Sequence, residues 1–349
     1  MRWTRSGSSS MMGRRSRSGL STVLFAFALA GCTALHGAPG LVRARHPLED
    51  PPRSQDLVGR LAFRDARAED TLIDLGPELG VGYTELLAAN PGVDPWLPKE
   101  GTRLVVPSAR LLPSGPREGI VVNLGDLRLY YFEPGAPPRS YPIGIAKEGY
   151  ATPLGETAVT AKREKPTWVP GESARRDDPS LPRAIEPGPD NPLGEYALYL
   201  GWPTYLIHGT NDARGVGRHS SRGCIRLYPQ DITELYARVP IGTRVRVIDE
   251  PVKVGWIGGE LYLEANPDAE QSLAIDQSGK AAAPREPKGW REQVAAAAGA
   301  RAAQVDWERA ERAALRRSGV PTRITGGPPR PGEQRPTTAN ASSAAAQVR

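Results

Sequence analysis

The sequence predicts a mostly β fold, in which a domain of short strands at residues 117–249 follows a small α+β domain at residues 57–108. Two observations support this fold class. Short apolar runs bounded by Gly, Pro and Asp recur at close spacing through 117–249, with one helical stretch among them. Residues 57–107 instead predict the order strand, helix, helix, strand. The chain is therefore expected to have at least two folded parts.

The basic character of the chain comes from its N-terminus. There are 45 Lys and Arg against 39 Asp and Glu, which gives a net charge of +6. Five of the arginines lie in the first 17 residues, where there is no acidic residue. Removing these five charges from +6 leaves +1, so the charge of the remaining chain does not predict a nucleic-acid partner.

The N-terminal segment has the pattern of an export signal. The apolar run Leu20–Ala30 follows the arginines and is too short to span a bilayer. Leu29-Ala-Gly-Cys32 resembles a bacterial lipobox, which implies a lipoprotein signal peptide at 1–31 and a lipid on Cys32. Thr33, in place of Asp, implies sorting to the outer membrane. The alternative is an ordinary secretory signal with a chance cysteine. The expected location is the periplasmic face of the cell envelope, with a lipid anchor at the outer membrane.

Cysteine usage draws attention to one residue. The chain has two cysteines, and two cysteines in an exported protein normally indicate a disulfide. If Cys32 carries lipid, Cys224 has no partner. An unpaired thiol in an oxidising compartment is liable to oxidation, so its presence predicts that Cys224 has a role in the chemistry of the protein. Residues 32–56, which are rich in Pro, Arg, Ala and Gly, are interpreted as a tether.

The small domain at 57–108 is predicted element by element. A strand is expected at 57–63, helices at 71–80 and 83–89, and a closing strand at 101–107. Asp70 is the expected N-cap of the first helix. Pro77 lies inside that helix and predicts a kink or a break.

The domain at 117–249 is predicted to consist of strands joined by turns, with one helix. That helix is expected from Pro229 to about residue 239, because proline suits the first helical turn. The segment 163–195 is long for a connection, which is typical of a functional lid or of disorder. Strands are expected at 120–124, 127–132, 140–146, 196–200, 204–208 and 244–248.

The C-terminal part gives weaker signals. A hairpin extension is expected at 250–265. Residues 266–349 are interpreted as a low-complexity tail with one helix at 290–317.

The stretch from His208 to Arg226 carries the candidate chemistry. A thiol with a pKa near about 8.5 is mostly protonated at neutral pH. His208, at the end of an apolar strand, is placed to take the proton of Cys224 and leave a thiolate–imidazolium pair. The backbone carbonyl of Gly209 is placed to orient the imidazole ring.

The residues around the cysteine complete the expected site. Gly223 allows a substrate backbone to approach, and the amides of Gly223 and Cys224 are candidate oxyanion donors. Arg226, two residues after the cysteine, is a candidate for binding a carboxylate. Ser221 and Arg222 are further candidates for substrate binding.

Three other interpretations compete for this stretch. A buried, inert cysteine is the ordinary state of a single Cys. A zinc site from His208, His219 and Cys224 lacks a fourth ligand and the short spacings that zinc prefers, so no metal is expected. A papain-like protease has its cysteine early and its histidine far downstream, whereas here the histidine comes first.

The two motifs resemble a known family. Ile-His208-Gly-Thr, followed by Ser221-x-Gly-Cys224-Ile-Arg226-Leu, is similar to the signature of the L,D-transpeptidases with a YkuD-type catalytic domain. Further stretches resemble the ErfK/YbiS/YcfS/YnhG group within this family, and the resemblance covers about 57–265. Residues 57–108 look like that group's LysM-like module, whose phrase Asn90-Pro-Gly-Val-Asp-Pro-Trp-Leu-Pro is present.

The resemblance implies a fold and a reaction. The fold is a YkuD-like β-sandwich with short helices. Cys224 is the nucleophile that attacks a tetrapeptide stem at meso-diaminopimelate and releases D-Ala, and His208 is the base and then the acid. The acyl group passes to an amine, either the lysine of a Braun-type lipoprotein or a second diaminopimelate. No cofactor is implied. The implied partners are peptidoglycan stem peptides and glycan, and a membrane through the N-terminal lipid.

One residue departs from the family pattern. The family commonly has histidine in Ser-His-Gly-Cys, and this chain has Arg222 there. Arg222 is expected to lower the pKa of the thiol or to bind a stem carboxylate. Two other functions remain open: a non-catalytic, LysM-type wall anchor, and an L,D-carboxypeptidase or hydrolase in which water replaces the amine.

Overall fold

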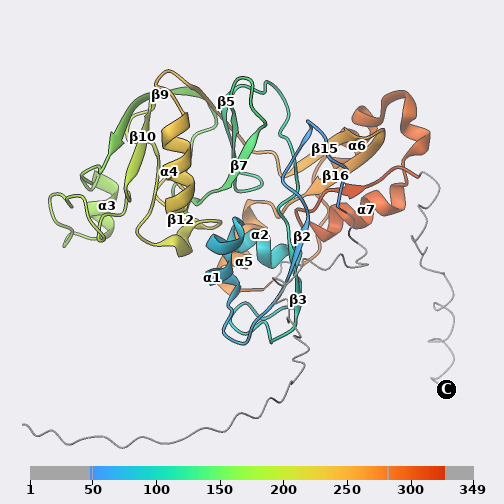
Figure 1. Cartoon of the computed structure of the whole chain (residues 1–349), viewed down its shortest axis with the longest axis horizontal. Coiled ribbons are helices and arrows are strands. Elements are labelled where there is room, and N and C mark those ends of the chain that lie inside the picture. Colours follow the sequence, from blue (N-terminus) through green and yellow to red (C-terminus); the bar gives the residue numbers. More distant parts are fainter. Residues whose placement is uncertain (1–47, 49, 281–282, 327–349) are drawn as a thin grey trace, which may run out of the picture. The chain divides into compact units, whose positions relative to one another are not determined.

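The computed structural model describes residues 48, 50–280 and 283–326 (Figure 1). The expected signal peptide, Cys32 and most of the tether lie outside the described residues, as does the chain after residue 326. All described residues fall within one unit of the chain, 41–349. Among the described helices, none combines the length and the apolar character that crossing a membrane requires.

The N-terminal part has the expected strand–helix–helix–strand order. Its elements are β1 (Leu57–Val58), β2 (Ala62–Asp65), α1 (Leu72–Leu79), α2 (Tyr83–Ala89), β3 (Arg103–Val106) and β4 (Arg110–Leu111). Apolar residues from both helices and from β3, among them Leu72, Leu86 and Leu104, form one buried cluster. The buried Asn90 side chain ties α2 to β3, because it donates to the carbonyls of Leu86 and Val105 and accepts from the Val105 amide.

Two details of this part differ from the sequence prediction. The single strand expected at 57–63 is two strands, since β1 pairs with β4 and β2 pairs with β3. The N-cap of α1 is Thr71, whose hydroxyl accepts from the Asp74 amide at 3.2 Å, while Asp70 accepts from the Arg67 amide. Helix α1 runs through Pro77 without a break.

The central part is built on one eight-stranded sheet with the order β13-β11-β10-β9-β14-β5-β6-β7. The expected β-sandwich would have two separate sheets. Here all eight strands belong to one sheet, because each strand is hydrogen-bonded to the next one in this order. Helix α4 begins at Pro229, as expected, and lies against β10 (Figure 1). The elements are β5 (Gly119–Asn123), β6 (Arg128–Phe132), β7 (Arg139–Pro142), β9 (Gly155–Glu164), β10 (Tyr196–Leu200), β11 (Leu206–His208), β13 (Ile225–Arg226), α4 (Pro229–Arg238) and β14 (Arg244–Ile248).

A second, two-stranded sheet pairs β8 (Ile145–Ala146) with β12 (His219–Ser221). The strand expected at 140–146 is therefore divided between β7 and β8. The core of the central part lies among the sheet strands and α4, where Ile120, Leu198, Ile207 and Ile232 are fully buried. This packing fixes β11, which ends at His208.

The long connection 163–195 contains a short helix, α3 (Glu172–Asp177). Trp168 and Ile185 bridge its two arms through paired backbone hydrogen bonds of 2.8 Å. The buried amide of Asn191 closes the base of the connection by donating to the carbonyls of Pro166, Ile185 and Glu186.

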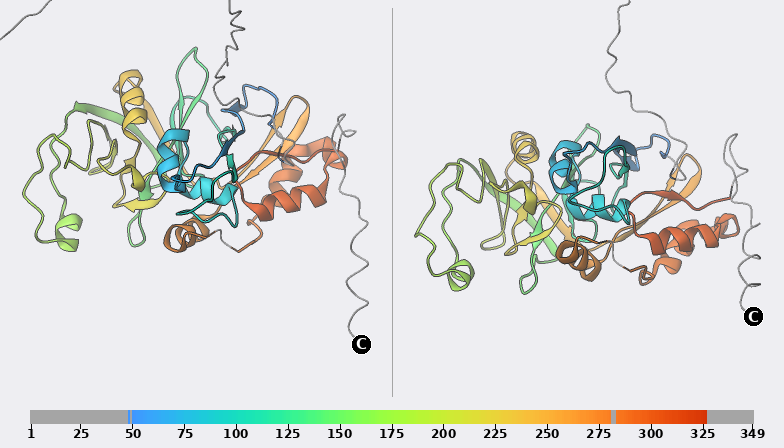
Figure 2. Two further views of the ribbon diagram at one scale, coloured as in Figure 1. Left: turned by 60° about the horizontal axis from the view of Figure 1, so that its bottom comes forward. Right: turned by 90° about the horizontal axis from the view of Figure 1, so that it is seen from below.

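The C-terminal part is more ordered than the sequence predicted. The hairpin of β15 (Val252–Ile257) and β16 (Glu260–Ala265) gains a third strand, β17 (Thr322–Arg323). Helices α6 (Trp290–Ala298) and α7 (Trp307–Arg316) pack on this sheet (Figure 2). The single helix expected at 290–317 is interrupted, because the backbone of Gly299 leaves the helical region with φ at +52° and a 3-10 turn, η2 (Gly299–Gln304), follows.

The interpretation of 266–288 as low-complexity is wrong over α5 (Ala269–Ser278). Asp268 accepts from the Gln271 amide at the N-terminus of this helix, and Gly279 ends it in the left-handed conformation. Ile275 is the only strongly apolar residue of α5 that is buried, and it packs into the core of the N-terminal part. A helix with so little apolar periodicity is hard to detect in a sequence.

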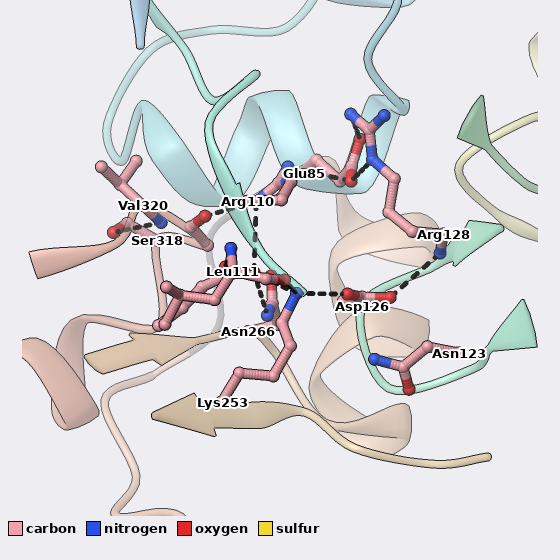
Figure 3. Close-up of polar contacts among 12 residues, drawn as sticks. Glu85, Arg110, Leu111, Asn123, Asp126, Arg128, Lys253, Asn266, Ser318 and Val320 are labelled. Atoms are coloured by element: carbon pink, nitrogen blue, oxygen red, sulfur yellow. Dashed lines mark hydrogen bonds and ion pairs between the residues drawn. The ribbon is translucent and has the colours of Figure 1, made fainter. Parts of the chain in front are cut away.

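A buried ionic network joins the three parts of the chain (Figure 3). Glu85 of α2 binds Arg128 at 2.6 Å and Arg110 at 2.9 Å. Lys253 of β15 binds Asp126 at 2.7 Å and Glu264 of β16 at 2.8 Å. All six side chains are at least 95% buried, so each charge depends on its partners for stabilisation.

Candidate active site

Cys224 lies in the tight turn between β12 and β13, and Ser221 holds this turn. The Ser221 hydroxyl donates to the Cys224 carbonyl at 2.7 Å and accepts from the Gly223 amide at 3.1 Å. Thr152 also donates to the Gly223 carbonyl, at 2.9 Å. The Ser221 hydroxyl therefore stabilises the backbone of the turn at both Gly223 and Cys224.

Gly223 is required by the backbone of the turn. Its φ is +121°, a value that residues with a Cβ rarely adopt. A Cβ at this position would lie 2.8 Å from Cε1 of Tyr205 and 3.0 Å from the Ala151 carbonyl oxygen. The expectation that the Gly223 amide donates to an oxyanion does not fit this structure, because that amide already bonds to Ser221. The Cys224 amide is the candidate donor that remains.

The Cys224 side chain is partly buried. It is the free cysteine of the described residues, and its Sγ lies 3.4 Å from the carbonyl oxygen of Thr204. Burial raises the pKa of the thiol, while a hydrogen bond from the Leu206 backbone and the charge of Arg226 act in the opposite direction. In the resting state the sulfur is a thiol.

His208 ends β11 and is 3% exposed. Its Nδ1 lies 2.6 Å from the carbonyl oxygen of Gly209, so in the neutral ring Nδ1 carries the proton and Nε2 carries the lone pair. Burial, followed by the positive charge of Arg226, lowers the pKa of His208 to about 3. Both shifts favour the neutral forms of the two side chains, whereas the sequence predicted a thiolate–imidazolium pair.

The parallel pairing of β11 with β13 brings these residues together. The register places His208 beside Arg226, and Cys224 lies two residues before Arg226 on the adjoining strand. The Leu206 amide, two residues before His208, bonds to the thiol. The two motifs are thus neighbours because one strand pair joins them.

Arg226 forms no close ion pair with a carboxylate in the described part of the chain, although the charge of Asp212 acts on it. Its Nε is buried and has no hydrogen-bond partner among the described residues. Burial lowers the pKa of the guanidinium, and no described carboxylate forms an ion pair with it. A partly buried, unpaired guanidinium beside a thiol and an imidazole is suited to bind an anionic group of a ligand.

Arg222 is bound to the connection 163–195. Its Nε donates to Oδ2 of Asp177, at the end of α3, at 2.9 Å. The Asp177 carboxylate also accepts from the Tyr150 hydroxyl at 2.8 Å and binds Lys147 at 3.3 Å, and these contacts lower its pKa to about 2. The guanidinium that acts on the pKa of Cys224 is Arg226, so the structure does not support the thiol-tuning role expected for Arg222.

The zinc alternative gains no support. Within the described ranges, no group of three or more His, Cys, Asp and Glu side chains could hold a metal ion. His219 lies on β12, where its backbone amide donates to Asp276 of α5 at 3.2 Å.

Asp177, Thr204 and the Leu206 amide were missed by sequence reasoning. Asp177 lies 45 residues before Arg222, in a segment rich in proline and charge that carries no motif. Thr204 and Leu206 act through their backbones, so their residue types gave no signal.

Comparisons with known proteins agree with the two motifs. The family model of the YkuD L,D-transpeptidase catalytic domain matches residues 117–247. A relative named "Probable L,D-transpeptidase ErfK/SrfK" from Escherichia coli is 39% identical over 287 residues, which is 79% of this chain and 90% of the relative. The "Probable L,D-transpeptidase YbiS" of the same organism is 46% identical over 183 residues, 50% of this chain and 59% of the relative.

Among solved structures, a crystal structure of an Enterococcus faecium L,D-transpeptidase mutant is 22% identical, covers 38% of this chain and 50% of that chain, and gives a TM-score of 0.31. The assignment rests on the relatives and the family model. The match to ErfK/SrfK over nine-tenths of its length, together with the catalytic-domain match, shows that the chain belongs to the L,D-transpeptidase family with a YkuD catalytic domain.

Proposed function

We propose that this L,D-transpeptidase acts on peptidoglycan stem peptides, with Cys224 as the nucleophile and His208 as the general base and acid. The observation that carries the proposal is the unpaired Arg226 guanidinium, placed beside His208 by strand register and two residues from Cys224. A tetrapeptide stem supplies both an amide for the thiol and carboxylates for the arginine.

The first step is acylation. Cys224 Sγ attacks the carbonyl carbon at the L-centre of diaminopimelate, and its proton passes to Nε2 of His208 as the bond forms. Because both groups are neutral at rest, the transfer accompanies attack and does not precede it. The Gly209 carbonyl holds the Nδ1 proton and thereby favours the imidazolium that forms.

The acyl-enzyme forms when the leaving amine takes the proton from His208. D-Ala departs, and a thioester on Cys224 remains. The Cys224 amide is placed to donate to the oxyanion, and Arg226 holds a stem carboxylate. Ser221 keeps the turn in its conformation through both of its hydrogen bonds. An amine acceptor, a Braun-type lipoprotein lysine or a second diaminopimelate, then receives the acyl group.

The proposal extends to the N-terminal part and to location. The strand–helix–helix–strand order of 57–108 supports a LysM-like module that holds wall glycan. Trp96 and Leu97, 63% and 59% exposed on the turn after α2, offer an apolar surface to a sugar ring. The lipobox-like Leu29-Ala-Gly-Cys32 supports a lipid anchor on Cys32 and a place in the periplasm, at the outer membrane.

The test uses the full chain and a defined tetrapeptide muropeptide. Mass spectrometry is expected to show a carbapenem adduct on Cys224 and release of D-Ala from the muropeptide, both lost in Cys224→Ala. Product with an added amine identifies a transferase, and tripeptide as the sole product identifies a carboxypeptidase. Absence of both the adduct and D-Ala release from reduced, folded protein would leave only the wall-anchoring function.

A further inference from the structure

The strand that leads into the catalytic turn, β12, lies outside the large sheet. It forms a two-stranded sheet with the short strand β8. On the other side of the turn, β13 belongs to the eight-stranded sheet. The two ends of the turn that presents Cys224 are therefore held by different structures, and the end at β12 depends on contacts beyond its small sheet.

Helix α5 holds the beginning of β12 through Asp276. One carboxylate oxygen of Asp276 accepts from the His219 amide at 3.2 Å, and the other accepts from Nε of Arg218. In addition, Nη2 of Arg218 donates to the Asp276 carbonyl at 3.3 Å. The Asp276 side chain is only 8% exposed, so these contacts are shielded from water. His219 opens β12, five residues before Cys224.

Helix α5 is itself firmly placed. Asp268 accepts from the Gln271 amide at 3.0 Å and thereby caps the N-terminus of the helix. Ile275, the residue before Asp276, is 1% exposed in the core that α1 and α2 form. The carboxylate of Asp276 therefore projects from a fixed helix.

Helix α2 lies beside α5 and contacts the same segment (Figure 1). The Thr84 amide donates to the Gly217 carbonyl at 3.2 Å, and the Tyr83 ring lies 5.3 Å from the Arg218 guanidinium. A Cβ on Gly217 would lie 2.3 Å from Cα of Gly82, so the two backbones are in direct contact. The residues just before β12 are thus held between α2 and α5.

Both helices lie outside residues 117–247, which match the catalytic-domain model. The constraint that they place on β12 reaches the turn through Ser221, the last residue of the strand. The Ser221 hydroxyl bonds to the backbone of Gly223 and of Cys224. A misplacement of about 1 Å in a reacting group can cost about a hundredfold in rate, so the position of β12 matters for acylation.

We propose that Asp276 is a positioning residue for acylation, which sets the place of the Cys224 sulfur from outside the catalytic domain. The inference rests on the proposed function, because it concerns the nucleophile of that reaction. Asp276 acts through the backbone of His219 and not by contact with the substrate. The ion pair with Arg218 holds the carboxylate in the orientation that this hydrogen bond requires.

Two substitutions test the hydrogen bond in the full chain. Asp276→Leu keeps a branched side chain and removes the acceptor of the His219 amide, whereas Asp276→Asn keeps one acceptor oxygen. With a tetrapeptide donor, Asp276→Leu is expected to lower kcat for D-Ala release about tenfold and to leave KM unchanged, since a hydrogen bond to a charged group is lost. Asp276→Asn should retain most of the parental kcat.

The alkylation of Cys224 by iodoacetamide gives a readout that a merely stabilising residue would not move. The Leu206 backbone and the charge of Arg226 lower the pKa of the thiol against the effect of burial, and both depend on where the sulfur lies. In Asp276→Leu the displaced sulfur loses part of these interactions, so the pH–rate profile of alkylation should move to higher pH. Asp276→Asn should keep the parental profile.

Two controls separate positioning from other effects. Glu270→Gln changes an exposed carboxylate on the same helix, which pairs with Arg285. Lys253→Met removes a buried charge that binds Asp126 and Glu264, and it controls for loss of stability. At a temperature where circular dichroism shows each variant folded, both controls should keep the parental kcat and alkylation profile. Arg218→Met, which releases the carboxylate from its ion pair, should change both in the same direction as Asp276→Leu and serves if that variant does not fold.

Three outcomes overturn the inference. They are a parental kcat and alkylation profile in folded Asp276→Leu or, in its place, Arg218→Met; equal changes in Lys253→Met; or an Asp276→Asn variant as impaired as Asp276→Leu. Failure of the parent to release D-Ala overturns the proposed function instead. The alkylation profiles do not depend on that reaction, so the two failures are distinguishable.

Discussion

The buried ionic network gives a prediction whose size follows from the structure. Lys253 is 1% exposed and binds Asp126 at 2.7 Å and Glu264 at 2.8 Å, and its Nζ also donates to the Leu111 carbonyl and the Tyr130 hydroxyl. Lys253→Met keeps most of the unbranched side chain and removes the charge. Two buried carboxylates then lose their shared cation, and such a loss costs about 3–5 kcal/mol of the free energy of unfolding.

For a protein of more than 250 described residues, with an unfolding entropy of about 2.1 cal/mol/K per residue, that loss corresponds to a fall in Tm of about 5–9 °C. Differential scanning calorimetry and urea unfolding measure it. The sign of the pH dependence also follows from the structure. The charges of Asp126 and Glu264 raise the pKa of Lys253 against the effect of burial. The contribution of Lys253 to the stability of the fold is therefore fully present below the ordinary lysine pKa, and it is lost only as the pH rises through the raised value. The effect should therefore be the same at pH 6 and pH 8.

Arg244→Met is the matched control, because Arg244 also has two carboxylate partners, Glu118 and Glu156, but is 60% exposed. Exposed ion pairs contribute little to the free energy of unfolding, so this variant should unfold close to the parent. A loss in Lys253→Met no greater than that in Arg244→Met would refute the reasoning. Adding Glu264→Gln and Asp126→Asn to Lys253→Met should restore part of the stability, since no buried charge then remains unpaired.

Four further changes test the active site. Lowering the pH from 6.5 to 4.5 should cost the parent about 2 kcal/mol more stability than His208→Gln, because the depressed His208 pKa lets the unfolded chain bind a proton that the folded chain excludes; urea unfolding at each pH measures this, and equal slopes would contradict it. Gly223→Ala should abolish the carbapenem adduct, since a Cβ at φ +121° meets Tyr205 and Ala151; an adduct formed at the parental rate would show that the turn tolerates it. Arg226→Met should raise KM for the tetrapeptide donor at least about tenfold, whereas a donor amidated at its free carboxylates should bind both forms equally in steady-state kinetics. Arg222→His should leave the pH–rate profile of acylation unchanged, because Arg222 is bound to Asp177 and not to the thiol, and a shifted profile would restore the thiol-tuning role.

Local signals predicted much of the fold. The helix at 83–89 and the start of α4 at Pro229 follow from apolar spacing and from proline in the first turn. The apolar runs at 120–124 and 127–132 predicted the two strands that pair as β5 and β6. Helix α5 was not predicted, because a single strongly apolar contact, Ile275, holds it and produces no periodic pattern.

The sequence by itself determined which residues are candidates for the chemistry. The spacing from His208 to Cys224 and Arg226, and the glycine before the cysteine, are properties of the local chain and its resemblance to a family. The need for Gly223 is also local, since its φ value is set within the turn.

The tertiary structure alone decided how these residues meet and in which charge state. The pairing of β11 with β13 places Arg226 beside His208, and burial among distant elements favours the neutral forms of the histidine and the cysteine. Glu85 finds Arg128 at a separation of 43 residues. Such contacts depend on how whole elements pack, and desolvation depends on what covers a group, so neither is encoded in the local pattern of the chain.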